Sequence, residues 1–131
     1  MSIPFYCLAA MLLIVISTKL PVAVAMAKAA RGYDNRNPRV QQASLTGWGA
    51  RAVAAHQNSF EALMFFTPAV FISHLAGTPE MASQAATLAI VHTVARILYP
   101  AAYIANVHAV RSIIWGVGFV SSVWLAFLPV I

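Results

Sequence analysis

The chain has 131 residues, of which 61% are hydrophobic and only 8% carry a charged side chain. A soluble domain is charged at about a quarter of its positions, so this composition excludes a water-soluble domain and indicates an integral membrane protein. The formal net charge of +5 is then better explained by Lys and Arg kept on one side of a membrane than by a nucleic-acid surface.

Four apolar stretches predict four helices, over roughly 3–27, 46–76, 80–106 and 110–130, within a single domain covering 1–131. Each stretch reaches the ~20 residues that a helix needs to cross a hydrocarbon core ~30 Å thick. The predicted fold class is therefore all-α, an integral membrane four-helix bundle. A bundle this small exposes much of its apolar side wall, which favours a homo-oligomer.

The first stretch contains the only cysteine, Cys7, so the sequence predicts neither an intrachain disulfide nor a cysteine metal site. No Lys or Arg precedes the apolar run, whereas Lys19 and Lys28 follow it. This order is unlike that of a cleavable signal, and we expect the first helix to be retained. No zinc motif, P-loop, dinucleotide fingerprint or Ser–His–Asp set is found elsewhere.

Most of the positive charge lies in the first connection, where Asp34 alone offsets it. The Lys and Arg residues there are Lys28, Arg31, Arg36, Arg39 and Arg51. The second connection, around residues 77–80, has no Lys or Arg, and the third contains Arg111. Positively charged loops stay in the cytoplasm. We therefore expect the first and third connections there, with the second connection and both termini outside.

A polar stripe runs down the second predicted helix. Arg51, Asn58 and Glu61 are spaced i, i+7 and i+10, so they fall within ~80° of one another around the helix. A carboxylate inside a membrane span is costly without a partner or a proton, which makes Glu61 a candidate functional residue. The alternative is a polar clamp that only holds helices together. His56 points away from the stripe and is interpreted as an interfacial or packing residue and not as a ligand.

The third predicted helix carries a matching stripe of His92, Arg96, Tyr99 and Tyr103, spaced i, i+4, i+7 and i+11. If the two faces meet, Arg96 can neutralise Glu61. The tyrosine hydroxyls can then donate to an anion or a bound peptide. The alternatives are an interfacial tyrosine belt and, for the deeper His92, a structural role.

Arg111 opens the fourth predicted helix, where a lone Arg most often anchors the topology. The two polar stripes together predict a cleft near the cytoplasmic surface that is walled by apolar helices. Such a cleft suits a water-soluble anionic molecule that meets a lipid-soluble one.

Several segments resemble the membrane-associated eicosanoid and glutathione metabolism (MAPEG) superfamily, which includes microsomal glutathione transferases, leukotriene C4 synthase and prostaglandin E synthase. Three segments resemble its bacterial members: Asn37-Pro-Arg39, Leu45-Thr-Gly47 and Arg51-Ala52. Residues 55–61 resemble the family's Arg-Ala-x-x-Asn-x-x-Glu signature, with Ala54 at the position of its arginine.

The third-helix segment of that family is similar to Arg96-x-x-Tyr99-x-x-x-Tyr103, and Arg111-Ser112 is similar to the start of its fourth helix. The resemblance implies a left-handed bundle assembled as a homotrimer in a bacterial inner membrane, with the co-substrate glutathione bound between neighbouring subunits. It implies that six residues bind glutathione: Asn58, Glu61, Arg96, Tyr99, Tyr103 and Arg51.

On this resemblance, Glu61 would meet the α-amino group of glutathione. Arg111 occupies the position of the arginine thought to hold the thiolate, and it is the predicted catalytic residue. That role is chemically sensible because a cation beside a thiol lowers its pKa and supplies a nucleophile at neutral pH.

The predicted function is a membrane-bound glutathione-dependent transferase or peroxidase that acts on lipophilic electrophiles or hydroperoxides. Two departures from the family pattern, Ala54 for the arginine and Met64 for a proline, motivate an alternative. This is a non-catalytic protein of the same fold that serves as a scaffold or accessory subunit of a larger membrane complex. A third hypothesis is a small multidrug transporter. Such transporters have their functional Glu in the first helix, whereas the first helix of this chain has no acidic residue.

Overall fold

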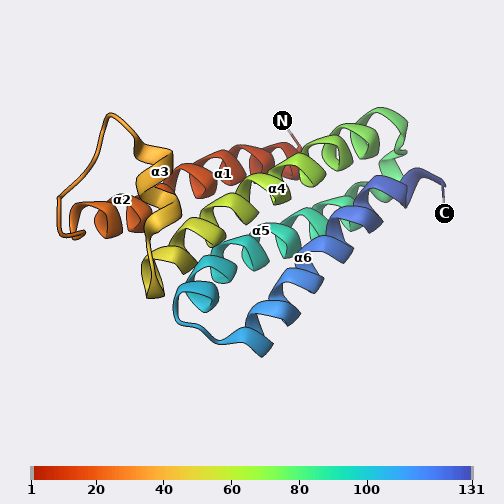
Figure 1. Cartoon of the computed structure of the whole chain (residues 1–131). Helices are drawn as coiled ribbons and strands as arrows, with labels where there is room; N and C mark the ends of the chain where they lie inside the picture. Colours follow the sequence, from red (N-terminus) through yellow and green to blue (C-terminus); the bar gives the residue numbers. More distant parts are fainter. Residues whose placement is uncertain (1, 131) are drawn as a thin grey trace.

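The computed structural model describes residues 2–130, so residues 1 and 131, the two ends of the predicted domain, lie outside the described part. Four helical crossings pack side by side (Figure 1), and each is long and apolar enough to span a membrane. About 85% of the chain is helical. The predicted all-α fold with four crossings is therefore confirmed, and the homotrimer stays a prediction.

The helical elements of the described residues follow the predicted order, with two additions, a break in the first crossing and a short helix after it. In chain order they are α1 (Ile3–Ser17), α2 (Lys19–Ala27), α3 (Pro38–Ser44), α4 (Gly47–Ala76), η1 (Pro79–Met81), α5 (Ala82–Ile104), α6 (His108–Phe127) and η2 (Leu128–Val130). The first and third connections lie at the same end of the bundle (Figure 1), as four antiparallel crossings require.

The core lies where α1, α4, α5 and α6 meet. Met11, Phe66, Ala89 and Leu125 have no exposed surface there. The outer wall of the bundle, in contrast, consists of exposed apolar side chains. The side chain of Met64, for example, is about three-quarters exposed. In water such a surface would be unfavourable, whereas in a bilayer it needs no cover, so the packing agrees with an integral membrane protein.

The short helix α3 was not predicted. It begins with Pro38, whose missing N–H costs nothing at a helix start, and it packs against α2 and α4. Gln41 fixes it to the preceding loop: its side-chain nitrogen donates to the carbonyls of Met26 and Gly32, and its side-chain oxygen accepts from the backbone N–H of Asp34. The positively charged connection is thus an ordered structure at one end of the bundle.

The break in the first crossing is held to α4 by a buried polar contact. The Thr18 hydroxyl donates to the Val15 carbonyl at 2.7 Å and lies 2.8 Å from Nδ1 of His56. Because the hydroxyl proton is used within α1, Nδ1–H of His56 is the donor to Thr18. The ring of His56 also packs edge-on against Phe60. These contacts agree with the interpretation of His56 as a residue that packs between helices.

Replacing Thr18 by Val is expected to destabilise the protein by about 1–3 kcal/mol, because it leaves the buried Nδ1–H of His56 without an acceptor while the shape is kept. Thermal unfolding in detergent measures this loss. Thr87→Val is the matched control, since the Thr87 hydroxyl bonds only to the Ser83 carbonyl one turn back on an exposed face of α5. Equal unfolding midpoints for the two variants would contradict a role for the Thr18–His56 contact.

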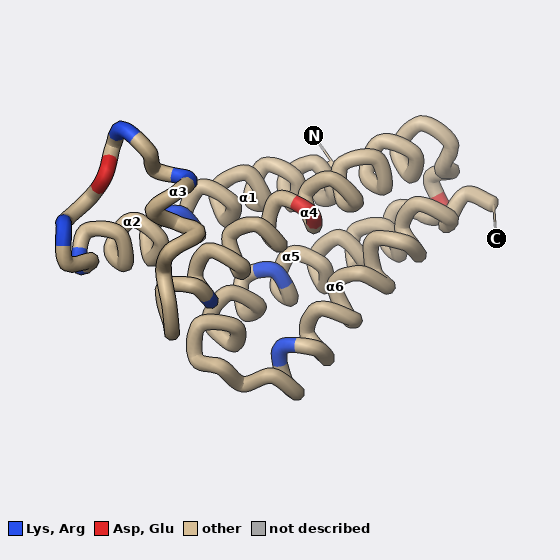
Figure 2. The backbone as a smooth tube through the Cα atoms, viewed as in Figure 1, with Lys and Arg blue, Asp and Glu red and all other residues tan. Residues whose placement is uncertain are grey.

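Charged side chains are distributed unevenly along the bundle. Lys and Arg concentrate toward the end formed by α2, α3 and the α5–α6 turn (Figure 2). At the opposite end, the α4–α5 turn carries Glu80 as its only Lys, Arg, Asp or Glu among the described residues. The bundle therefore has one cationic end and one end almost without charge.

Candidate functional site

The two predicted polar faces meet between α4 and α5. Arg96 is only 2% exposed and heads the fully buried side chains by size. Its Nη2 donates to Oδ1 of Asn58 at 2.7 Å, and Nδ2 of Asn58 donates to Oε2 of Glu61 at 2.8 Å. Asn58 and Glu61 are one turn apart on α4, which makes them neighbours. The faces therefore meet as expected, but Arg96 is linked to Glu61 through the carboxamide of Asn58.

A row of aromatic and cationic groups continues from this contact toward α6. The guanidinium of Arg96 lies 4.3 Å from the ring centroid of Tyr99. Tyr99 and Tyr103 pack edge to face, with centroids 5.6 Å apart. The guanidinium of Arg111 then lies 4.4 Å from the centroid of Tyr103. Each cation–π contact is worth about 0.5–2 kcal/mol, and together they hold Arg111 near the polar stripe. We call these six residues the Arg96 cluster: Asn58, Glu61, Arg96, Tyr99, Tyr103 and Arg111.

Two hollows border the Arg96 cluster. An inner cavity of about 50 Å³ is lined by Asn58, Glu61, Ala62, Phe65, His92, Arg96, Trp115, Phe119 and Ser122. An outer pocket of about 300 Å³ is lined by Tyr99, Tyr103, Arg111, Ser112 and Trp115. Because Trp115 borders both, the two hollows adjoin. Glu61 and Arg96 therefore face one cavity, and Arg111 faces the space next to it.

The contribution of α6 beyond Arg111 was missed at the level of sequence. Trp115, Phe119 and Ser122 line the inner cavity, and they follow Arg111 at i+4, i+8 and i+11, which is one helical face. This spacing was the sequence signal that these three residues share a face with Arg111. It was obscured because aromatic residues in a membrane helix usually face lipid or lie at the interface. Phe65 of α4 lines the cavity and was missed for the same reason.

His92 ties α5 to α6 beside the cavity. Its Nδ1 lies 2.9 Å from the Gly118 carbonyl and 2.7 Å from the Ser122 hydroxyl, and its ring stacks on Phe66. Since a carbonyl only accepts, Nδ1 carries the proton, and Nε2 is left as an acceptor. Nε2 of His92 and Nε of Arg96 are buried without a partner among residues 2–130.

Arg51, the sixth predicted glutathione contact, is not part of the Arg96 cluster. Its Nε donates to the carbonyl of Ile104 at 2.9 Å. This bond satisfies a carbonyl in the last turn of α5, where a cation also interacts favourably with the helix dipole. The stripe predicted along α4 is therefore divided: Asn58 and Glu61 face the inner cavity, and Arg51 binds the end of the neighbouring helix.

Gly118 allows α6 to approach the site closely. A Cβ there would lie 3.4 Å from Cβ of Ala95 and 3.5 Å from Cδ of Arg96, so a methyl group would already be in van der Waals contact with both side chains. We expect Gly118→Val to displace Arg96 and to weaken the binding of glutathione, the predicted co-substrate, at least tenfold. Gly116→Val is the matched control, because nothing lies within 4 Å of a Cβ at Gly116. Titration with glutathione measures both affinities, and equal affinities of the two variants would contradict the role of Gly118 in the packing around Arg96.

The chemistry available in the Arg96 cluster is that of recognising a peptide-like anion. The exposed carboxylate of Glu61 accepts one bond from Asn58 and has remaining capacity for an ammonium group. Arg111 presents a cation next to two tyrosines, where an anionic sulfur or oxygen would be stabilised. Among residues 2–130 there is no group of three or more His, Cys, Asp or Glu that could hold a metal ion.

The fold and the site define an integral membrane four-helix protein with a buried arginine cluster facing a crevice between helices. The sequence model of the MAPEG family matches residues 3–131, which is nearly the entire chain, and the protein therefore belongs to the MAPEG family. This family includes glutathione transferases and related membrane proteins. Comparisons with curated proteins and with solved structures gave no match.

Proposed function

We propose that the protein is a glutathione-dependent transferase or peroxidase that acts on lipophilic electrophiles or hydroperoxides. The hydrogen-bonded chain from Arg96 through Asn58 to Glu61, with Arg111 beside it, carries this proposal. It places a carboxylate and two guanidinium groups around adjoining hollows at the edge of an apolar bundle. Membership of the MAPEG family supports the same assignment.

The groups of glutathione fit the groups of the crevice. Glutathione has one ammonium group, two carboxylates and a thiol. In our proposal Glu61 binds the ammonium group, and Asn58 and Arg96 fix the orientation of Glu61 from the protein side. The hydroxyls of Tyr99 and Tyr103 donate to the carboxylates. Arg111 stabilises the thiolate, because a nearby cation favours the charged form of a thiol.

The second substrate enters from the bilayer. Phe65, Trp115 and Phe119 line the inner cavity and are also part of the exposed apolar wall, so a lipophilic molecule can approach the site without crossing water. In conjugation, the thiolate sulfur bonds to the electrophilic carbon, and the leaving group departs with its bonding electron pair. In peroxide reduction, two glutathione molecules are oxidised to the disulfide, while the hydroperoxide becomes an alcohol and water.

We also propose that three subunits assemble in the membrane with the site at the cytoplasmic end, and that glutathione binds between neighbouring subunits. The concentration of Lys and Arg at the end of α2 and α3 supports this orientation. The assignment of Arg51 as a glutathione contact stays a prediction, since within one subunit its guanidinium binds the carbonyl of Ile104.

Glutathione binding to the purified protein in lipid nanodiscs tests the proposal. Calorimetric titration is expected to give saturable binding, and a chlorinated dinitrobenzene substrate is expected to be conjugated. Glu61→Gln should weaken binding of glutathione about tenfold, but should have little effect on an analogue that lacks the α-amino group. A folded protein that binds no glutathione at millimolar concentration would rule the proposal out.

A further inference from the structure

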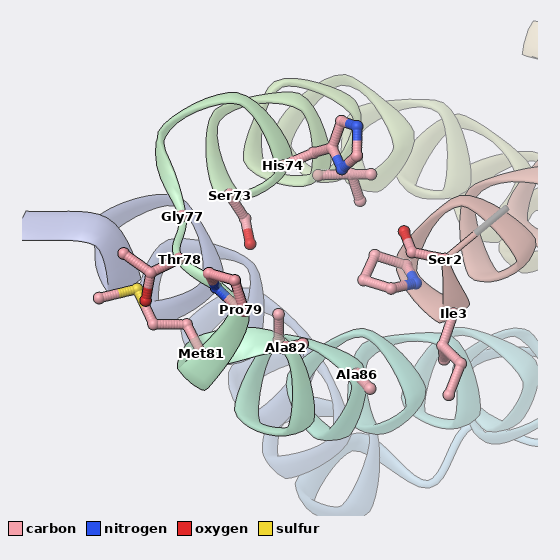
Figure 3. A pocket seen from close by; sticks show the side chains of 13 residues that line it. Ser2, Ile3, Ser73, His74, Gly77, Thr78, Pro79, Met81, Ala82 and Ala86 are labelled. Carbon is pink, nitrogen blue, oxygen red and sulfur yellow. The ribbon is translucent and has the colours of Figure 1, made fainter.

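A separate hollow lies at the nearly uncharged end of the bundle (Figure 3). Its volume is about 380 Å³, within the range of small-molecule sites. It exists because α1 begins at Ile3, while α4 and α5 continue beyond the start of α1 to the turn at Gly77 (Figure 1). We call it the distal pocket.

Ser73 supplies a buried polar group to the distal pocket. Its side chain is 8% exposed, and Figure 3 shows its hydroxyl oxygen pointing into the hollow. The other buried Ser and Thr side chains of residues 2–130 all form hydrogen bonds within the protein: Thr18, Ser59, Thr93, Ser121 and Ser122. Ser73 is the exception. Because no hydrogen bond joins the Ser73 hydroxyl to another atom of residues 2–130, it is available to donate to or accept from a ligand atom in the pocket.

Polar groups line the distal pocket from α4, from the turn at Thr78 and from the chain start at Ser2, whereas its α5 side is apolar. Ser73 and His74 are on the α4 side, and the His74 ring is held edge-on by Phe5 at 4.9 Å. The α5 side presents Met81, with Ala82, Ala85 and Ala86. The turn between these two sides needs Gly77, because a Cβ there would collide with the Ser73 carbonyl. The α5 side of the pocket is therefore a hydrocarbon wall, and the hydrogen-bonding groups lie on the other sides.

Depth and charge narrow the ligand class further. The pocket lies where α4 ends and α5 begins, and the ends of membrane-spanning helices lie at the level of the lipid headgroups. No Lys or Arg occurs from residue 52 to residue 95, so the imidazole of His74 is the one basic side chain of the described residues that lines the pocket, and an anionic headgroup would meet no permanent cation from these helices. An uncharged amphiphile fits best, with its polar head at the membrane surface and its chain between helices.

We propose that the distal pocket binds an uncharged amphiphile that carries a hydroxyl headgroup, of the monoacylglycerol type. Its hydroxyl bonds to Ser73, and the first carbons of its chain pack against Ala82 and Ala86. The site is at the other end of the bundle from the Arg96 cluster and does not depend on the proposed glutathione chemistry.

A photoreactive monoacylglycerol with a diazirine in its chain tests this assignment in phosphatidylcholine nanodiscs that contain the full-length protein. Peptide mass spectrometry is expected to locate adducts mainly in residues 2–4 and 77–86. Ala86→Phe, which fills the pocket, should reduce these adducts at least fivefold, and Ser73→Ala should reduce them about threefold. Ala101→Phe is the control, since Ala101 is an exposed alanine of α5 outside the pocket.

Three results would overturn the proposal. The first is adducts spread evenly over the lipid-facing wall, which indicates bulk lipid contact only. The second is equal labelling by a diazirine fatty acid, which contradicts the uncharged class. The third is unchanged labelling of Ser73→Ala. This last variant removes one atom, so it decides the question even if Ala86→Phe does not fold.

Discussion

Arg111→Ala is expected to lower kcat/KM for glutathione conjugation about 100-fold, which corresponds to about 2.7 kcal/mol of transition-state stabilisation. The expected cause is loss of the cation that stabilises the thiolate, an electrostatic contribution of the size found for groups placed beside a developing charge. The affinity for glutathione should change less than threefold, because Glu61 and Asn58 remain in place. Stopped-flow absorbance at saturating glutathione measures the chemical step.

Arg111→Lys and Arg36→Ala separate this role from general charge effects. Lys keeps a positive charge near Tyr103 and should restore part of the rate. Arg36 is an exposed cation of the first connection, and its loss should leave the rate unchanged. If Arg111→Ala kept full activity, Arg111 would be a topology anchor and the thiolate would need another cation.

Asn58 is the position where stability and ligand binding can be separated. Asn58→Ala removes the Oδ1 atom that accepts from the buried Arg96 guanidinium. We expect a loss of about 2–3 kcal/mol, because the buried guanidinium loses its short bond and keeps only the 3.4 Å bond to the backbone carbonyl of Asn58. The unfolding midpoint should fall by on the order of 5–10 °C. Glutathione binding should be lost as well, since Glu61 loses the donor that orients it.

Asn58→Asp keeps an acceptor for Arg96 but replaces the donor to Glu61 by a second carboxylate. This variant should unfold near the temperature of the parent protein and still bind glutathione at least tenfold more weakly. Gln57→Ala, the neighbouring exposed amide on α4, should change neither property. If Asn58→Asp bound glutathione normally, Asn58 and Glu61 would act only as the polar clamp that is the alternative interpretation of this stripe.

The four crossings could be predicted because length and apolarity alone determine them in a membrane protein. The turn after α4 was also accessible, since Gly77 ends that helix and Pro79 begins the next element. The break at Thr18 had a local signal in Pro21, since a proline disturbs the helical turn before it, but the contact of Thr18 with His56 from another helix had none. Helix α3 has seven residues, too few to show a helical period.

The α4 and α5 parts of the site followed from helical spacing, but their pairing did not. Spacing places Asn58, Glu61 and Arg96 on facing stripes, yet only coordinates show that the carboxamide lies between the two charges. Spacing also groups Arg51 with Asn58. In the structure, however, the guanidinium of Arg51 donates to the carbonyl of Ile104 at the end of α5. Such choices depend on which acceptors a neighbouring helix presents, and no single-helix pattern contains that information.

The tight turn between α5 and α6 has a consequence for how the crevice is made. Only Ala105–Val107 separate the two helices, and Asn106 adopts a left-handed backbone conformation with φ of +62°, which Asn tolerates better than most residues. So short a loop has little closure entropy to overcome. Arg96, Tyr99, Tyr103 and Arg111 can thus assemble within one helical hairpin. The packing of this hairpin against α4 adds Asn58 and Glu61 and so completes the crevice from two separately formed parts.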